Sequence, residues 1–259
     1  MNLSTAQKNF WDDNGFIHLP QFFGDGTALR HWTHDMSTWP ETAGKWMKYF
    51  EQIGEADEKL LCRMENFLHF HEGWKDVIYN EGLMTVLEIL FHEPALLFKE
   101  KLNFKLPGGN GFTAHQDAPA FASFGQDFHI TAMVSIDDTT RQNGCLEMVP
   151  GKHRAGLLEM TKDKVLSQEA IDALTWVPLE TKSGDLVLFD SYIPHRSGPN
   201  QSASARRAAY VTYNAQSQGD YRDAYYRHKR EVFPPDIERI PGKDYGDTGL
   251  YNIGNPIAE

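Results

Sequence analysis

The sequence predicts a mainly β domain, a sandwich or barrel of short strands, behind a first third that is mainly helical. After residue 95, short apolar runs alternate with clusters rich in Gly, Pro, Asn and Asp. Short strands in series are typical of antiparallel sandwiches and barrels rather than of parallel α/β sheets. No repeat, low-complexity tract or linker divides the 259 residues, so a single domain over residues 1–259 is expected.

Capping signals mark the helices of the first third. Ser4 and Gln7 form a capping box, so a helix is expected to begin there and to end near Asn14-Gly15. The remaining elements expected in this third are a strand over Phe16–Pro20 and helices over Thr27–Ser37 and Glu81–Phe91.

Strand-like segments fill the core, which is expected over about residues 95–215. The expected strands are Leu96–Leu106, Phe128–Ile136, Cys145–Val149, Trp176–Leu179, Leu186–Phe189 and Ala208–Tyr213. A short capped helix over Ser167–Leu174 interrupts them. The C-terminal extension returns to helix-like sequence after Gly219, and its Pro-rich tail is expected to wrap the surface.

Composition limits the classes of partner. The chain has 25 Lys and Arg against 36 Asp and Glu, a net charge of −11, which opposes non-specific binding to nucleic acid or to anionic membranes. Cys62 and Cys145 are too few for a disulfide framework and fit a reducing compartment. No signal peptide or long apolar stretch is recognised. A cytoplasmic protein acting on small molecules is expected, with its oligomeric state open.

One constellation suggests metal chemistry. His115 and Asp117 are two residues apart, so in an extended segment both side chains point to the same face. His195 follows the apolar strand Leu186–Phe189 and can complete the set. Two His and one carboxylate leave open positions on iron(II) for a bidentate co-substrate and for oxygen. A turn histidine beside a solvated aspartate is the plainer alternative for the first pair.

Arg206 strengthens this interpretation. It lies eleven residues after His195, at the start of an expected strand, where its guanidinium can form a bidentate pair with an entering carboxylate. His195 alone can equally be a strand-end histidine packed against Pro194. The combination, rather than any one residue, therefore favours oxidative chemistry.

The sequence resembles the phytanoyl-CoA dioxygenase family of iron(II)/2-oxoglutarate hydroxylases. The motifs that carry the resemblance cover most of the chain: Phe16–Phe23, Lys101–Gly109, His115–Asp117, Asn143–His153, Gly184-Asp185, His195–Asn200 and Arg206-Arg207. It implies a double-stranded β-helix core, jelly-roll or cupin-like, with flanking α-helices. It also implies Fe(II) as cofactor, and 2-oxoglutarate and O2 as co-substrates.

The resemblance further implies roles for individual residues. His115, Asp117 and His195 would bind the iron, and Arg206, helped by Ser197, would bind the distal carboxylate of 2-oxoglutarate. The residues that match other positions lining the co-substrate pocket are Lys105, Asn103, Gln116 and Thr131. Related halogenases replace the metal-bound carboxylate with a small residue, so Asp117 favours hydroxylation.

The substrate is predicted from a charged and aromatic segment before the core. The residues suited to recognising a small zwitterion are Tyr49, Glu51, Arg63, Glu65 and Asn66. This segment resembles the substrate cover of bacterial dioxygenases that hydroxylate 2-aminoethylphosphonate next to phosphorus, in organophosphonate catabolism. An acyl-CoA, an amino acid or a small natural product is the alternative substrate. Solvated faces with one internal ion pair would explain the same residues without any ligand.

Two other classes of function stay open. A zinc site built on His69 and His71, or on His31 and His34, lacks a third ligand at a telling spacing. A non-catalytic metal-binding or sensor barrel would keep the fold, but it has no need of open iron positions.

Overall fold

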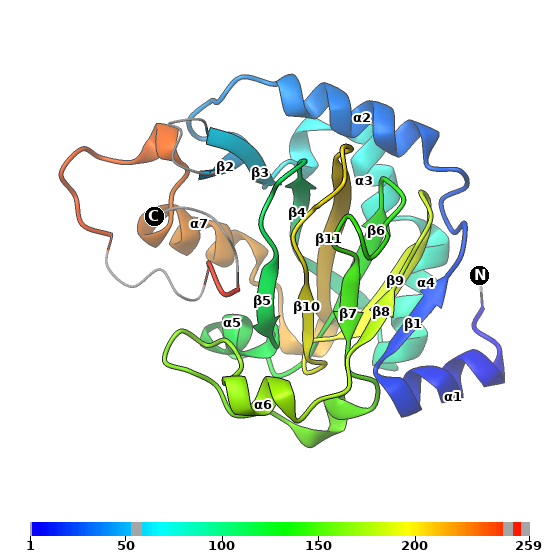
Figure 1. Cartoon of the computed structure of the whole chain (residues 1–259). Coiled ribbons are helices and arrows are strands. Elements are labelled where there is room, and N and C mark those ends of the chain that lie inside the picture. The colour runs from blue at the N-terminus through cyan, green and yellow to red at the C-terminus, as the bar shows by residue number, and fades with distance from the viewer. Residues whose placement is uncertain (1, 53–58, 246–250, 255–259) are drawn as a thin grey trace.

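The computed structural model describes residues 2–52, 59–245 and 251–254. Two antiparallel β-sheets face each other, and helices cover the outer face of the larger sheet (Figure 1). This is the two-sheet architecture expected of a double-stranded β-helix, so the predicted fold class is confirmed.

Within the residues described, the larger sheet has seven strands and the smaller has four. In spatial order the larger comprises β1 (Phe16–Leu19), β9 (Leu186–Asp190), β6 (His129–Ser135), β11 (Arg206–Ala215), β4 (Ala95–Lys105), β3 (Lys59–Glu65) and β2 (Met47–Gln52). The smaller comprises β5 (Phe112–His115), β10 (His195–Ser197), β7 (Leu146–Met148) and β8 (Val177–Leu179).

Helices precede, interrupt and follow the strands. The α-helices are α1 (Thr5–Asn14), α2 (Thr27–Thr38), α3 (Glu72–Ile78), α4 (Glu81–Phe91), α5 (Ala118–Phe121), α6 (Gln168–Asp172) and α7 (Arg222–Val232). Single turns of 3-10 helix occur at Leu68–Phe70, Ala122–Phe124, Lys152–Ala155, Gln216–Gln218 and Asp236–Glu238.

The predicted capping signals are confirmed. The Ser4 hydroxyl accepts a hydrogen bond from the Gln7 amide at 3.3 Å, and Gly15 ends α1 with a positive φ of 77°. Asn80 begins α4 by accepting from the Leu83 amide at 3.2 Å. These local bonds fix where the helices meet the sheet.

Two apolar layers hold the sheets in place. One lies between the helices and the larger sheet and includes Trp74, Leu87 and Leu102, all fully buried. The other lies between the two sheets, where Met133 of β6 and Met148 of β7 belong to one buried cluster. Apolar burial on both faces makes the larger sheet the rigid wall of the site.

The first third contains elements that the sequence did not predict. Strands β2 and β3 and helix α3 were not predicted, and β3 extends the larger sheet by pairing with β4. Glu51, Arg63 and Glu65 are almost fully buried within these strands, so their charges hide the usual alternation of apolar and polar residues. Tyr251 and Ile253 of the tail are likewise buried, so these residues do not wrap the surface as expected.

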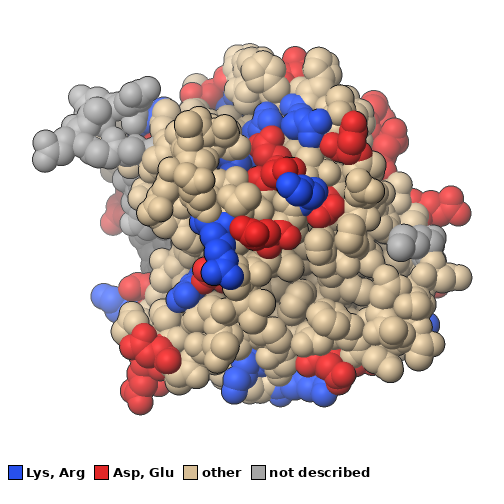
Figure 2. Space-filling model, turned by 45° about the vertical axis from the view of Figure 1, so that its right-hand side comes forward, with Lys and Arg blue, Asp and Glu red and all other residues tan. Residues whose placement is uncertain are grey.

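One face of the molecule mixes charges of both signs and shows no continuous basic surface. On the face drawn in Figure 2, acidic and basic side chains lie side by side near the upper centre, with mostly uncharged residues around them. Within residues 2–52, 59–245 and 251–254, no helix combines the length and apolar character needed to cross a membrane.

Candidate metal centre

The three predicted ligands meet between the two sheets. His115 ends β5 and His195 begins β10, and the two residues are direct partners in the antiparallel register. Asp117 lies two residues beyond His115, at the start of α5. One ligand atom from each residue lies within 4.8 Å of the others, and no other such group of His, Cys, Asp or Glu occurs among the described residues.

Hydrogen bonds orient both imidazoles toward the carboxylate. Nδ1 of His115 lies 2.7 Å from the Thr113 carbonyl, and Nδ1 of His195 lies 3.1 Å from the Ile193 carbonyl. A carbonyl can only accept, so each Nδ1 carries the proton and each Nε2 presents its lone pair. The two Nε2 atoms lie 3.6 and 3.8 Å from Oδ1 of Asp117.

Burial keeps His195 suited to binding a metal. Loss of solvent, reinforced by the neighbouring His115, lowers the pKa of His195 to about 4, so the imidazole is neutral at physiological pH. Neutral imidazole nitrogens together with a carboxylate oxygen are a donor set that fits iron(II). The carbonyl partners of both Nδ1 atoms are the outer contacts that metal-binding histidines require.

The cavity at the triad has walls from both sheets. Its lining residues are Lys101, Asn103, Phe112, His115, Asp117, Leu146, His195, Arg196, Ser197 and Tyr210. Asn103 and Ser197 were predicted to line the co-substrate pocket. His115, Asp117 and His195 were predicted as metal ligands, and Lys101, Phe112, Arg196 and Tyr210 were not predicted as site residues.

A buried cationic pair lies next to this cavity. Arg206 of β11 and Lys105 of β4 are direct register partners, and Arg206 is fully buried. Its guanidinium makes one long contact, 3.5 Å to the Tyr210 hydroxyl, and its Nε has no partner within the described part of the chain. A buried guanidinium without a counter-ion is costly, so a carboxylate ligand fits here.

Lys105 is held more firmly than Arg206. Its Nζ donates to the Ser197 hydroxyl at 2.8 Å and to the carbonyls of Gly198 at 2.6 Å and Gly144 at 3.2 Å. Burial, followed by the charge of Arg206, lowers the pKa of Lys105 to about 6. An anion between the two cations would relieve this repulsion.

Two other predicted co-substrate residues are placed differently. Thr131 is buried on β6 and shares a hydrogen bond of 3.1 Å with the Thr212 hydroxyl. Gln116 does not reach the cavity, because its amide donates to the Gly156 and Tyr192 carbonyls and accepts from the Leu158 amide. Its position between His115 and Asp117 turns it to the opposite face of an extended segment.

Three of the predicted substrate residues, Tyr49, Arg63 and Glu65, form a network and do not line the cavity. Both oxygens of Glu65 accept from Lys229 at 2.7 Å, and Arg63 donates to Glu65 at 3.1 Å. The Lys229 ammonium also lies 5.0 Å from the centre of the Tyr49 ring. The carboxylate and aromatic ring expected to recognise an amine therefore surround a lysine of the same chain.

The other two residues of that prediction lie apart from this network. Glu51 accepts from the backbone and side-chain nitrogens of Asn110 at 3.2 Å. Asn66 ends β3 in a left-handed conformation with φ of 55°. Neither residue lines the cavity at the triad.

The C-terminal tail contacts the His115 motif, which was not expected. The Thr113 amide donates to the Gly254 carbonyl at 2.9 Å, which brings the tail against the start of the His115 motif. A Cβ atom at Gly254 would lie 2.8 Å from Nδ1 of His115. Nothing in the spacing of the sequence predicts this contact, because it joins segments far apart in the chain.

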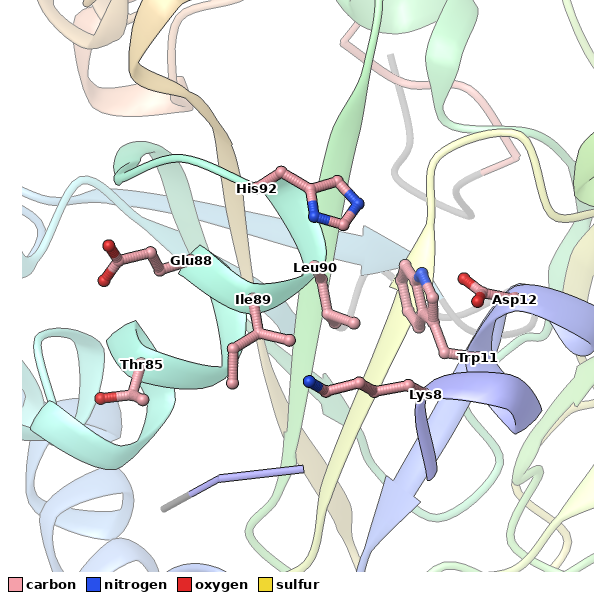
Figure 3. Close-up of a pocket in the computed structure, with 8 residues that line it drawn as sticks. All are labelled: Lys8, Trp11, Asp12, Thr85, Glu88, Ile89, Leu90 and His92. Carbon is pink, nitrogen blue, oxygen red and sulfur yellow. The ribbon is translucent and has the colours of Figure 1, made fainter. Parts of the chain in front are cut away.

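A second hollow lies elsewhere, between α1 and α4 (Figure 3). Its lining residues are Lys8, Trp11, Asp12, Thr85, Glu88, Ile89, Leu90 and His92. It includes none of the triad residues.

His71, one of the alternative zinc candidates, begins α3 by accepting from the Trp74 amide at 3.1 Å.

Comparison with known proteins connects this geometry to a family. The sequence profile of the phytanoyl-CoA dioxygenase family matches residues 11–208. The chain is 50% identical to a 2-aminoethylphosphonate dioxygenase of uncultured bacterium HF130_AEPn_1, over 98% of each chain. It is 40% identical to a methylphosphonate hydroxylase of Gimesia maris, over 89% of this chain and 88% of the relative.

Solved structures share the fold at lower sequence identity. EctD from S. alaskensis, crystallised with 2-oxoglutarate and 5-hydroxyectoine, superposes with a TM-score of 0.71 at 20% identity, covering 83% of this chain and 77% of that one. The epimerase SnoN from nogalamycin biosynthesis gives a TM-score of 0.65 at 16% identity, covering 81% and 82%.

Proposed function

This chain belongs to the phytanoyl-CoA dioxygenase family of iron(II)- and 2-oxoglutarate-dependent oxygenases, and from that premise we propose that it hydroxylates 2-aminoethylphosphonate at the carbon next to phosphorus. The observation that carries the choice of substrate is the 50% identity to a 2-aminoethylphosphonate dioxygenase over 98% of both chains. Residues 1–259 would act as one domain, in the cytoplasm, in organophosphonate catabolism.

His115, Asp117 and His195 would hold the iron. Their ligand atoms converge, and both Nδ1 atoms are engaged by carbonyls, which leaves the Nε2 atoms to bind. Iron(II) bound there with 2-oxoglutarate and O2 supplies the oxidising chemistry for a C–H bond. The chain's own contribution is to fix the three donors and to exclude water from the space between the sheets.

Arg206, Lys105 and Ser197 would bind the distal carboxylate of 2-oxoglutarate. Arg206 supplies a planar fork of donors, and its Nε has no partner among the described residues. Lys105 reaches the Ser197 hydroxyl at 2.8 Å, so the ammonium and the hydroxyl present donors to the same place. Asn103 lines the cavity, and its Oδ1 has no hydrogen-bond partner within the described part of the chain. Thr131 supports the neighbouring strand.

Methylphosphonate is the second candidate substrate, because a methylphosphonate hydroxylase is 40% identical to this chain. Both candidates carry a phosphonate group, so they differ in the amine and not in the anion. An acyl-CoA is disfavoured by the net charge of −11, which opposes binding of the CoA phosphates.

The test is succinate formation by iron(II)-loaded protein with 2-oxoglutarate under air, with and without each candidate. Phosphorus NMR of the mixture would identify the hydroxylated carbon. Stimulation by 2-aminoethylphosphonate well above methylphosphonate is the expected result. Stimulation by methylphosphonate alone would move the assignment to the second candidate, and failure of both would remove the phosphonate proposal.

A further inference from the structure

We propose that Lys99 and Lys101, in the middle of strand β4, bind the anionic group of the substrate, a phosphonate, apart from Lys105 at the end of the strand. This assignment rests on the proposed function, because it names how that substrate is held. It also identifies a second anion site in the molecule, separate from the one assigned to 2-oxoglutarate.

Strand β4 directs the side chains of Lys99 and Lys101 to the same face as that of Lys105. Lys101, Asn103 and Lys105 occupy alternate positions of β4, so their side chains share one face. Lys101 lines the same cavity as His115, Asp117 and His195. An anion held by Lys101 would therefore have its neighbouring carbon beside the triad, where hydroxylation takes place.

The two ammonium groups contact aromatic rings rather than carboxylates. Lys99 is buried, and its Nζ lies 4.4 Å from the centre of the Phe121 ring. The Nζ of Lys101 lies 5.3 Å from the centre of the Tyr210 ring. Within the described residues neither lysine forms a hydrogen bond or an ion pair. Ring faces stabilise a cation only partly, so both ammonium groups keep donors for a ligand.

Nearby carboxylates do not balance these charges. Glu65 is the closest candidate in the register, opposite Lys101, but both its oxygens accept from Lys229 and one also from Arg63. Asp117 is the other acidic group that acts on the two lysines, and it belongs to the metal triad. Burial, followed by repulsion from Lys99 and Arg63, lowers the pKa of Lys101 to about 7. An anion bound beside Lys101 would offset both the loss of solvent and this repulsion, and would favour the charged ammonium form.

A phosphonate matches this excess of charge. The co-substrate carboxylate is already provided for by Arg206 and Lys105, so the remaining cations require a second anion. A phosphonate carries up to two negative charges on three oxygens and can accept from both ammonium groups at once. The shared anion would also explain why the relatives named above act on different phosphonates.

The experiment compares Lys101→Gln and Lys99→Gln with Lys75→Gln, which replaces a lysine on the surface of α3 that is 50% exposed. Succinate formation gives the KM for 2-aminoethylphosphonate and, separately, for 2-oxoglutarate. Loss of one charged hydrogen-bond donor should raise the KM for the phosphonate at least about tenfold. The KM for 2-oxoglutarate should stay within about twofold, and Lys75→Gln should change neither. Lys101→Arg should recover part of the loss.

Calorimetry provides a readout that does not depend on turnover. Methylphosphonate and inorganic phosphate are titrated into anaerobic iron(II) protein with 2-oxoglutarate bound, for the wild type and both lysine variants. Binding to the wild type and weaker binding to Lys101→Gln are expected. Thermal unfolding of each variant identifies any that has simply lost its fold, and Lys101→Arg then replaces it in the comparison.

The outcomes separate this inference from the proposed function. An unchanged phosphonate KM in Lys101→Gln would overturn the inference and leave the function in place. An equal rise in both KM values would assign the lysines to the co-substrate instead. If no phosphonate is turned over, the function fails, and calorimetry still decides: lysine-dependent binding of methylphosphonate keeps the anion site, and absence of binding removes it.

Discussion

The last residue of strand β4 and a residue in its middle are both lysines, but their surroundings differ. At the end of the strand, Lys105 donates to Ser197, Gly198 and Gly144 and lies beside Arg206. In the middle of the strand, Lys101 lies over the Tyr210 ring without a bonded partner among the described residues. One cation is fixed before any ligand arrives, and the other is free to adapt.

Under the proposed assignments, the difference follows how constant each ligand is. The co-substrate is common to the family, so a rigid site fixed by backbone carbonyls costs nothing in versatility. The substrate varies between relatives, and a lysine on a flexible stem adjusts to different anions more readily than a fixed fork of donors. The comparison makes predictions for each of the two lysines and for the metal centre.

The largest effect should come from His115→Ala. Removing one of three ligands should lower the affinity for Fe(II) by at least about a hundredfold and abolish turnover with every substrate. Metal content after desalting and succinate formation measure both. His34→Ala, which changes an exposed histidine of α2, is the matched control. Full iron content in His115→Ala would exclude the triad as the metal centre. The positions of both anion sites relative to the iron would then have no support.

Glu65→Gln should destabilise the fold without loss of catalytic chemistry. Glu65 neutralises Lys229 and Arg63 in a buried network, and removing one member of such a network costs about 3–5 kcal/mol of unfolding free energy. Urea unfolding measures the change. Glu72→Gln, which breaks an exposed pair with Lys75, should cost at most about 1 kcal/mol. A stable Glu65→Gln with a raised KM for the phosphonate would return Glu65 to the substrate site.

The same substitution predicts a pH dependence. Burial alone would raise the pKa of Glu65, but Lys229 and Arg63 outweigh it and lower the pKa to about 2. Because the pKa is lowered, the ionised carboxylate stabilises the native state at pH values above its ordinary pKa of 4.5. This stabilisation is lost as the pH falls from 4.5 toward 2. The difference in stability between wild type and Glu65→Gln should therefore narrow through that range. A difference that stays constant down to about pH 2 would contradict this assignment.

Arg206→Lys should affect only the binding of 2-oxoglutarate. Lysine keeps the charge but loses the planar pair of donors, so the KM for 2-oxoglutarate should rise about 10- to 100-fold. The KM for the phosphonate should change by less than about twofold. An equal rise in both would mean that the two anions share Arg206.

The smallest effect expected is the energetic coupling between Lys101 and Lys105. Lys101 and Lys105 are four residues apart on an extended strand, a separation of about 13 Å. In the double variant Lys101→Gln/Lys105→Gln, each KM should follow the single variants within about 0.5 kcal/mol. A larger coupling energy would show that one anion contacts both lysines.

Local signals in the sequence predicted much of this architecture. Capping residues and turns marked α1, α4 and most core strands, because caps and turns depend on neighbouring residues. The His-x-Asp spacing brought His115 and Asp117 together for the same reason, since an extended chain fixes the directions of residues i and i+2.

What the sequence could not predict depends on contacts across the fold. Strand β3 is recognisable only through its pairing with β4, because its buried charges are satisfied by Lys229 of α7. The sequence does not single out Lys101, because almost every position of β4 is buried. An alternation of apolar and polar residues therefore does not show which face of the strand meets the ligand. The direction of Gln116 could have been predicted, since it lies between two residues that face the cavity.

The contact of Gly254 with the His115 motif changes how the end of the chain should be treated in the laboratory. Terminal residues are usually the safest place for a fusion, a linker or a random substitution. Here a methyl group at residue 254 would lie 2.8 Å from a histidine of the metal centre. A purification tag is therefore better placed before α1, at the outer edge of the larger sheet (Figure 1), and mutagenesis libraries should treat Gly254 as a neighbour of the metal centre.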